Sequence, residues 1–154
     1  MAAGVYGMSS SKILLLGIVL NIAAGIGVGG YALVAHLFDS LQVITVVLIA
    51  LIFTIGGILL STSELQFWIF GIVMGVLVGP IQAASRSYLA HKAPPHLLNE
   101  MFGFYALSGK ATSFVGPLIV AWLTLATGSQ RVGVSIVLLF LLGGLGLIRS
   151  LKPD

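Results

Sequence analysis

Five long apolar stretches occupy most of this 154-residue chain, and they constrain its fold more than any other feature. They cover residues 13–34, 43–60, 67–89, 101–126 and 132–148. Each is close to the length of about 20 apolar residues that a helix needs to cross the hydrocarbon core of a bilayer. Strands are excluded because polar and apolar residues do not alternate, and because backbone groups in lipid must be satisfied within their own segment. The sequence predicts an all-α membrane protein with five transmembrane helices.

Charged residues are too scarce for a soluble domain. They make up 7% of the sequence, against roughly 25% in typical globular proteins, whereas 58% is hydrophobic. The seven Lys and Arg residues are spread along the chain and form no basic stripe, which excludes nucleic acid as a partner. The absence of cysteine excludes disulfides and thiolate chemistry. The expected partner of this surface is therefore the lipid bilayer.

The distribution of Lys and Arg near the span ends predicts the orientation in the membrane. The side that holds the Pro94-Pro95 loop and the C-terminus carries four basic residues, and the opposite side carries Lys12 and Arg131. The four are Arg86, Lys92, Arg149 and Lys152. Because positive residues collect on the cytoplasmic side, we expect that loop and the C-terminus to be cytoplasmic, at the inner membrane if the chain is bacterial.

Small residues predict how the helices pack. Five of them recur every fourth position of the third span and are expected to form a groove that another helix approaches closely. They are Gly71, Gly75, Gly79, Ala83 and Ser87. Gly25 and Gly29 form a shorter pair on the first span, and the short connections predict that consecutive spans are antiparallel neighbours. Pro80 and Pro117 fall inside spans and are expected to bend their helices.

Two positively charged residues, Arg86 and Lys110, lie inside predicted spans. A charge in the bilayer costs at least about 2.5–3.5 kcal/mol on insertion scales, so such residues usually serve a function. The acidic residues fall in loops, at span ends or in the tail: Asp39, Glu64, Glu100 and Asp154. The counter-charge is then a bound anionic solute, water in a cavity, or an acid on another segment. A carboxylate-bearing or otherwise anionic solute suits a path lined by Gln82, Ser85, Arg86, Tyr105, Ser108 and Lys110.

No pattern of enzyme chemistry accompanies these residues. His36, His91 and His96 lie near span ends, without the spacing of metal ligands. No serine is accompanied by a histidine and an acid in a recognisable arrangement. We therefore expect no catalytic residue, no metal site and no cofactor.

Several segments together resemble a known family. They are GPIQAASRS (79–87), Pro94-Pro95, EMFGFYALSGKATSF (100–114), Gly116-Pro117 and TGSQR (127–131). This set resembles the C-terminal signature of the vacuole-effluxer-like branch of the major facilitator superfamily, closely over residues 71–147 and loosely elsewhere. The resemblance implies that the five spans are helices eight to twelve of a twelve-helix transporter, with Ala2 to Met8 as the end of helix seven.

The resemblance also implies a function. The branch includes the fungal vacuolar amino-acid effluxer, so the chain is expected to be a C-terminal part of a secondary active transporter that works by alternating access. A small solute, amino acids among the candidates, and a coupling proton or ion are the implied ligands. The N-terminal half of the transporter is expected to be missing from this chain and to be its partner. A second interpretation of the same residues is a non-transporting membrane scaffold or assembly partner, whose small-residue grooves bind another membrane subunit.

Overall fold

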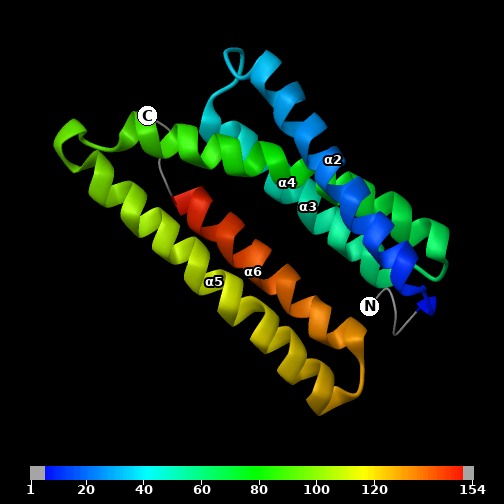
Figure 1. Cartoon of the computed structure of the whole chain (residues 1–154). Coiled ribbons are helices and arrows are strands. Elements are labelled where there is room, and N and C mark those ends of the chain that lie inside the picture. The colour runs from blue at the N-terminus through cyan, green and yellow to red at the C-terminus, as the bar shows by residue number, and fades with distance from the viewer. Residues whose placement is uncertain (1–5, 151–154) are drawn as a thin grey trace.

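The computed structural model describes residues 6–150, and five long helices make up most of this part of the chain (Figure 1). They are α2 (Ser10–Val34), α3 (Ser40–Leu60), α4 (Glu64–Lys92), α5 (Leu98–Thr127) and α6 (Gln130–Ser150), with a short 3-10 helix, η1 (Pro95–Leu97), before α5. Each of the five is long and apolar enough to cross a membrane. The predicted all-α membrane fold is confirmed. Of the residues used in the predictions, Ala2 to Val5, Lys152 and Asp154 lie outside the described range.

Polar caps extend the helices beyond the apolar stretches. Before α4, the Ser63 hydroxyl accepts a hydrogen bond from the Gln66 amide at 3.2 Å, and the Gln66 side chain accepts one from the Ser63 amide at 3.4 Å. This reciprocal pair is a capping box, which satisfies amides that a helix leaves free at its start. The Asp39 carboxylate caps α3 by accepting from the Leu41 amide at 3.2 Å. The capped helices α3 and α4 therefore begin three residues before their apolar stretches do.

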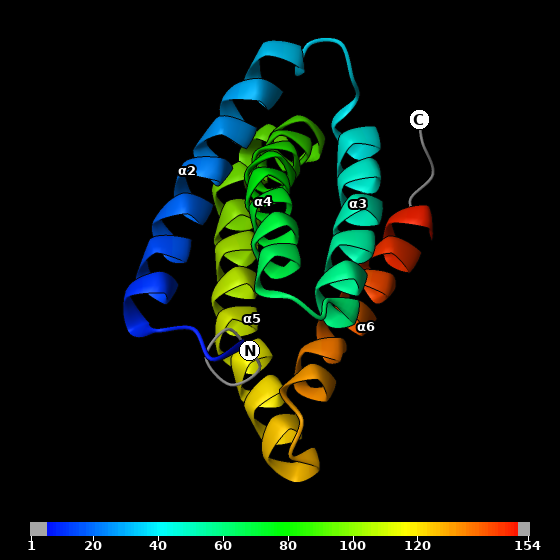
Figure 2. The same cartoon turned by 90° about the vertical axis from the view of Figure 1, so that its right-hand side faces the viewer.

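The helices form two antiparallel hairpins and one added helix. α3 pairs with α4, α5 pairs with α6, and α6 packs on α3. The expectation that all consecutive spans are neighbours is wrong for α2, which packs along α4, so that α4 lies between α2 and α3 (Figure 2). It is also wrong for α4 and α5, which make little direct contact. The α2 helix is an exception because the small residues on one face of α4 let α2 approach α4 more closely than it could approach α3.

That surface consists of glycines at every fourth residue. Gly71, Gly75 and Gly79 are all buried. A methyl group at Gly75 would lie 3.0 Å from the Leu20 carbonyl oxygen, and one at Gly79 would lie 2.4 Å from the Ala24 carbonyl oxygen. The two backbones therefore touch where these side chains are absent. Ala83 continues the row and lines a recess between α2 and α4.

On α2, the residue in this contact is Gly27. A methyl group there would lie 2.0 Å from the Val76 carbonyl oxygen, which no helix can accommodate without moving. Gly25 and Gly29 are exposed and have nothing within 4 Å of that position, so the prediction that they form the packing pair of this span is wrong. The sequence does not indicate which face of α2 is buried, because α2 is apolar on all sides and has no polar face opposite an apolar one.

Both prolines lie inside helices that continue across them. The Pro80 ring lies beside Gly27 at the α2–α4 contact, with its Cδ atom 3.0 Å from where a methyl group on that glycine would be. Pro117 is exposed on α5. The α5 helix has no buried residue at all within the described part of the chain. The buried core instead joins α3, α4 and α6, where Ile44, Leu48 and Ala84 pack against Leu141, Leu145 and Ile148.

Candidate functional site

A hollow of about 790 Å³ lies between α4 and α5 and opens to the outside of the described helices. Nine residues line it: Gln82, Arg86, Tyr105, Ala106, Ser108, Gly109, Lys110, Thr112 and Ser113. The first two belong to α4 and the others to α5. The hollow therefore contains both positively charged residues that the apolar spans carry.

Helical spacing explains why these residues gather. Gln82 and Arg86 are four residues apart, so they lie one above the other on the same face of α4. Tyr105, Gly109 and Thr112 share one face of α5 in the same way, at steps of four and three residues. The hollow is thus the space between two polar helix faces that are turned toward each other, each on an otherwise apolar helix.

No acidic residue lines the hollow. Within residues 6–150 the carboxylates are those of Asp39, Glu64 and Glu100, which stand just before a helix or in its first turn. Glu64 is paired with Lys12, with 2.7 Å between the Lys12 Nζ and Glu64 Oε1 atoms. The positive charges of Arg86 and Lys110 therefore meet no opposite charge among the side chains that surround the hollow.

The hydroxyl groups of α5 donate to their own helix. The Ser108 hydroxyl donates to the Tyr105 carbonyl at 2.8 Å, that of Thr112 to Ser108 at 2.9 Å, and that of Ser113 to Lys110 at 2.7 Å. With the protons used in this way, each oxygen keeps lone pairs that can accept a hydrogen bond from a ligand. The hollow thus combines two cationic groups with a row of acceptors.

Ser85 is the one predicted path residue that is not among the residues lining the hollow. It is half-buried, and its hydroxyl donates to the Ile81 carbonyl at 2.7 Å. Gln82, Arg86, Tyr105, Ser108 and Lys110 are brought together, from two helices separated by the Pro94-Pro95 connection. Sequence reasoning missed Thr112 and Ser113, although their position one to two turns after Ser108 on a helix was a usable signal.

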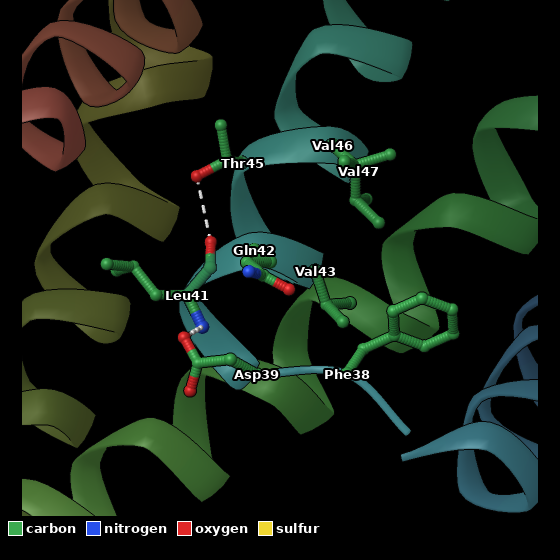
Figure 3. Close-up of a pocket in the computed structure, with 8 residues that line it drawn as sticks. All are labelled: Phe38, Asp39, Leu41, Gln42, Val43, Thr45, Val46 and Val47. Carbon is green, nitrogen blue, oxygen red and sulfur yellow. Dashed lines mark hydrogen bonds between the residues drawn. The ribbon is translucent and has the colours of Figure 1, made fainter. Parts of the chain in front are cut away.

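A second hollow, of about 700 Å³, lies at the connection from α2 to α3 and is lined by residues between Phe38 and Val47 (Figure 3). Its lining is mostly aliphatic and aromatic. Two of its polar side chains bond the local backbone: Asp39 caps α3, and the Thr45 hydroxyl donates to the Leu41 carbonyl at 2.8 Å. This hollow has no cation to recognise an anionic solute. Within the described residues, no three histidine or acidic side chains are placed to hold a metal ion either.

These features define a class: an integral, multi-pass membrane protein with a polar, positively charged hollow between its helices. A family model described as "Vacuole effluxer Atg22 like" matches residues 1–153. The chain belongs to this vacuole effluxer Atg22-like family, and the resemblance drawn from its motifs is confirmed at that level.

Individual relatives agree with the family. The chain is 34% identical over 139 residues to the "Uncharacterized MFS-type transporter YxiO" of Bacillus subtilis (strain 168), a match that covers 89% of this chain and 32% of the relative. It is 26% identical over 159 residues to Autophagy-related protein 22 of Cryptococcus neoformans var. neoformans serotype D (strain JEC21), covering 91% of this chain and 27% of the relative. Over 77 residues, half of this chain and 13% of the relative, it is 38% identical to Autophagy-related protein 22-2 of Emericella nidulans. No solved structure matches.

The matches cover only part of the length of each relative. The chain spans about a third of the length of the bacterial relative and less of the fungal one. The activity of the whole relatives is therefore carried over to this chain only as part of the proposal that follows.

Proposed function

We propose that this chain is the C-terminal part of a secondary transporter of the major facilitator kind, and that the hollow between α4 and α5 is half of its solute path. The observation that carries the proposal is the pair of cationic side chains, Arg86 and Lys110, in one hollow without an acidic lining residue. A path for an anionic group needs such uncompensated charge, because the solute itself then supplies the counter-ion. The printed name of the bacterial relative, an MFS-type transporter, supports the same class.

The chemistry of the lining favours a small solute with a carboxylate, amino acids included. The guanidinium of Arg86 offers paired donors that match a carboxylate, and the Lys110 ammonium adds a second positive charge. In the proposed path, the lone pairs of the Ser108, Thr112 and Ser113 hydroxyl oxygens accept hydrogen bonds from the ammonium group of an amino acid. A coupling proton or ion completes the scheme of alternating access that secondary transporters share.

The transporter interpretation also accounts for the exposed surface of α5. This helix lines the hollow with its polar face and buries no residue within the described part of the chain. Such a helix is suited to meet further helices of a longer chain across a shared path. The N-terminal half of the full-length transporter is the partner that the proposal requires.

The alternative of a membrane scaffold relies on free small-residue grooves. In the structure, the groove of Gly71, Gly75 and Gly79 is filled by α2 of the same chain. No other observation favours a scaffold, so the transporter is the function that we infer.

Orientation is part of the proposal. The α2–α3 connection, the α4–α5 connection and the end of α6 lie at one end of the helices (Figure 2). Two basic residues of the described range, Lys92 and Arg149, belong to this end. By the positive-inside rule we place it in the cytoplasm, which means at the inner membrane if the chain is bacterial.

Transport by single-charge variants tests the proposal. The intact transporter that contains this chain is reconstituted in lipid vesicles, and uptake of a mixture of radiolabelled amino acids is measured for the parent and for Arg86→Gln and Lys110→Gln. Both variants are expected to lose transport while inserting in normal amounts, because each lacks one of the charges that hold the carboxylate. Lys12→Gln is the matched control, since it removes a cation outside the hollow and is expected to transport normally. Parent-like transport by both Arg86→Gln and Lys110→Gln would contradict the proposal.

A further inference from the structure

The two halves of the hollow are held on helices that scarcely touch each other. Gln82 and Arg86 belong to α4, whereas the remaining lining residues belong to α5, and α4 and α5 make little direct contact. The α5 helix is attached mainly to α6, and α6 is attached to α3. A short connection (residues 93–97) joins α4 and α5 at one end, so the angle between them, and with it the width of the hollow, depends on how firmly the α5–α6 hairpin is seated on α3 (Figure 1).

The two helices of the hairpin are joined by a tight turn and packed closely beside it. Gly128 ends α5 with a φ of 66°, a left-handed conformation that favours glycine and allows a tight turn into α6. One turn into α6, Gly133 is buried against α5: a methyl group there would lie 2.0 Å from the Thr124 hydroxyl oxygen and 2.7 Å from the Val120 carbonyl oxygen. Because the two helices touch this closely, any contact that holds the start of α6 also holds the end of α5.

The start of α6 has one polar contact with the other hairpin. The Arg131 guanidinium donates from Nη2 to the carbonyl oxygen of Ser61 at 2.7 Å, across 70 positions of sequence. Ser61 is the C-cap residue that directly follows α3, and only 3% of its surface is exposed. A cation is favourable at this place because carbonyl groups at the end of a helix carry partial negative charge.

The same carbonyl is reached by a second element. The Tyr6 hydroxyl donates to it at 2.9 Å, and the Tyr6 ring lies 5.0 Å from the ring of Phe67 on α4. At the opposite end of α6, Leu141, Leu145 and Ile148 pack on the α3–α4 core. The hairpin is thus fixed by apolar packing at one end of α6 and by the Arg131 contact at the other.

We propose that Arg131 is a positioning residue: by bonding the carbonyl group that follows α3, it fixes the spacing of α4 and α5 at the end away from their connection, and through the angle between these two helices it sets the width of the hollow. Arg131 does not line the hollow and acts only through α6. The importance of this spacing for solute binding rests on the proposed function, whereas the spacing itself does not.

Distance measurements between spin labels test the spacing directly. The sequence has no cysteine, so pairs of introduced cysteines carry the only labels on this chain. One pair, Ile69→Cys on α4 and Leu125→Cys on α5, spans the end of the hairpin near Arg131, and both sites are exposed. A reference pair, Ile18→Cys on α2 and Ile69→Cys, reports the α2–α4 packing that Arg131 does not touch. The pairs are measured by pulsed electron resonance in the intact protein in lipid, without added solute.

Arg131→Met, which keeps an unbranched apolar side chain and removes the hydrogen-bond donors, is expected to broaden the distances between positions 69 and 125 and shift them to larger values. The reference distances are expected to stay unchanged. Arg131→Lys is expected to give 69–125 distances between those of the parent and those of Arg131→Met, because an ammonium group still donates to the carbonyl. Lys12→Met, which removes the ion pair at the same end, leaves both distances unchanged.

Two results would overturn the inference. An unchanged 69–125 distance in Arg131→Met would show that apolar packing alone seats the hairpin. Loss of both distances would show that Arg131 supports the whole fold instead of one spacing. In the transport assay, Arg131→Met is also expected to raise KM for the labelled amino acids, because the two halves of the hollow lie farther apart. A changed 69–125 distance with an unchanged KM would support the positioning role of Arg131 and count against the proposed function alone.

Discussion

Replacing Gly27 by alanine is the sharpest test of how the helices meet. The added methyl group would lie 2.0 Å from the Val76 carbonyl oxygen and 2.9 Å from its carbonyl carbon, both backbone atoms that cannot rotate away. Ordinary contact begins at 3.4 Å, so α2 and α4 must separate by about 1.4 Å at this point. Overpacking of this kind typically costs about 1–3 kcal/mol. We expect Gly27→Ala to lower the free energy of unfolding by that amount.

A matched control stands two residues away on the same helix. Gly29 has nothing within 4 Å of the methyl position, so Gly29→Ala is expected to leave stability unchanged or to raise it slightly, since alanine favours helix more than glycine does. Both variants are compared with the parent by titration with sodium dodecyl sulfate in mixed micelles, followed by the fluorescence of Trp68 on α4 in a Trp122→Phe background, because Trp122 is the second tryptophan of the chain. Parent-like stability of Gly27→Ala, or an equal loss in the two variants, would refute the close contact of α2 and α4.

Three further substitutions are measured by the same titration. Ser63→Ala removes the capping box of α4 and is expected to cost about 1 kcal/mol; no change would mean that Gln66 caps the helix alone. Gly128→Ala forces a side chain into a backbone with φ of 66° and is expected to cost about 1–2 kcal/mol, so an unchanged stability would contradict the tight turn between α5 and α6. Lys12→Met breaks an exposed ion pair and is expected to cost less than about 1 kcal/mol, and a larger loss would show that this pair is not a surface contact.

The sequence predicted the helices because the bilayer leaves few alternatives. Apolar length and internal hydrogen bonding define a transmembrane helix almost without reference to its neighbours. The packing of the helices against one another was harder to predict. The row of glycines on α4 marked a close contact, but a helix that is apolar all around, such as α2, does not reveal which of its faces is buried, and Gly27 was overlooked between Gly25 and Gly29.

The candidate site was partly predictable for a related reason. Charges such as Arg86 and Lys110 are conspicuous in apolar spans, and a hydroxyl-rich face on α5 is visible at helical spacing. What the sequence did not reveal was that Ser85 bonds its own helix instead of lining the hollow. Nor did it reveal the bond from Arg131 to Ser61, because contacts between residues 70 positions apart depend on how whole helices pack.

Access of water to the hollow tests the central claim most directly. Ser108 lines the hollow, whereas its neighbour Leu107 is exposed and is not among the lining residues. Ser108→Cys and Leu107→Cys are introduced one at a time into the intact protein in its membrane, and the rate of reaction with a charged, water-soluble methanethiosulfonate reagent is measured. The account predicts rapid reaction of the thiol at position 108 and little at position 107. Equal rates at the two positions, or no reaction at position 108, would contradict an aqueous hollow that holds Arg86 and Lys110.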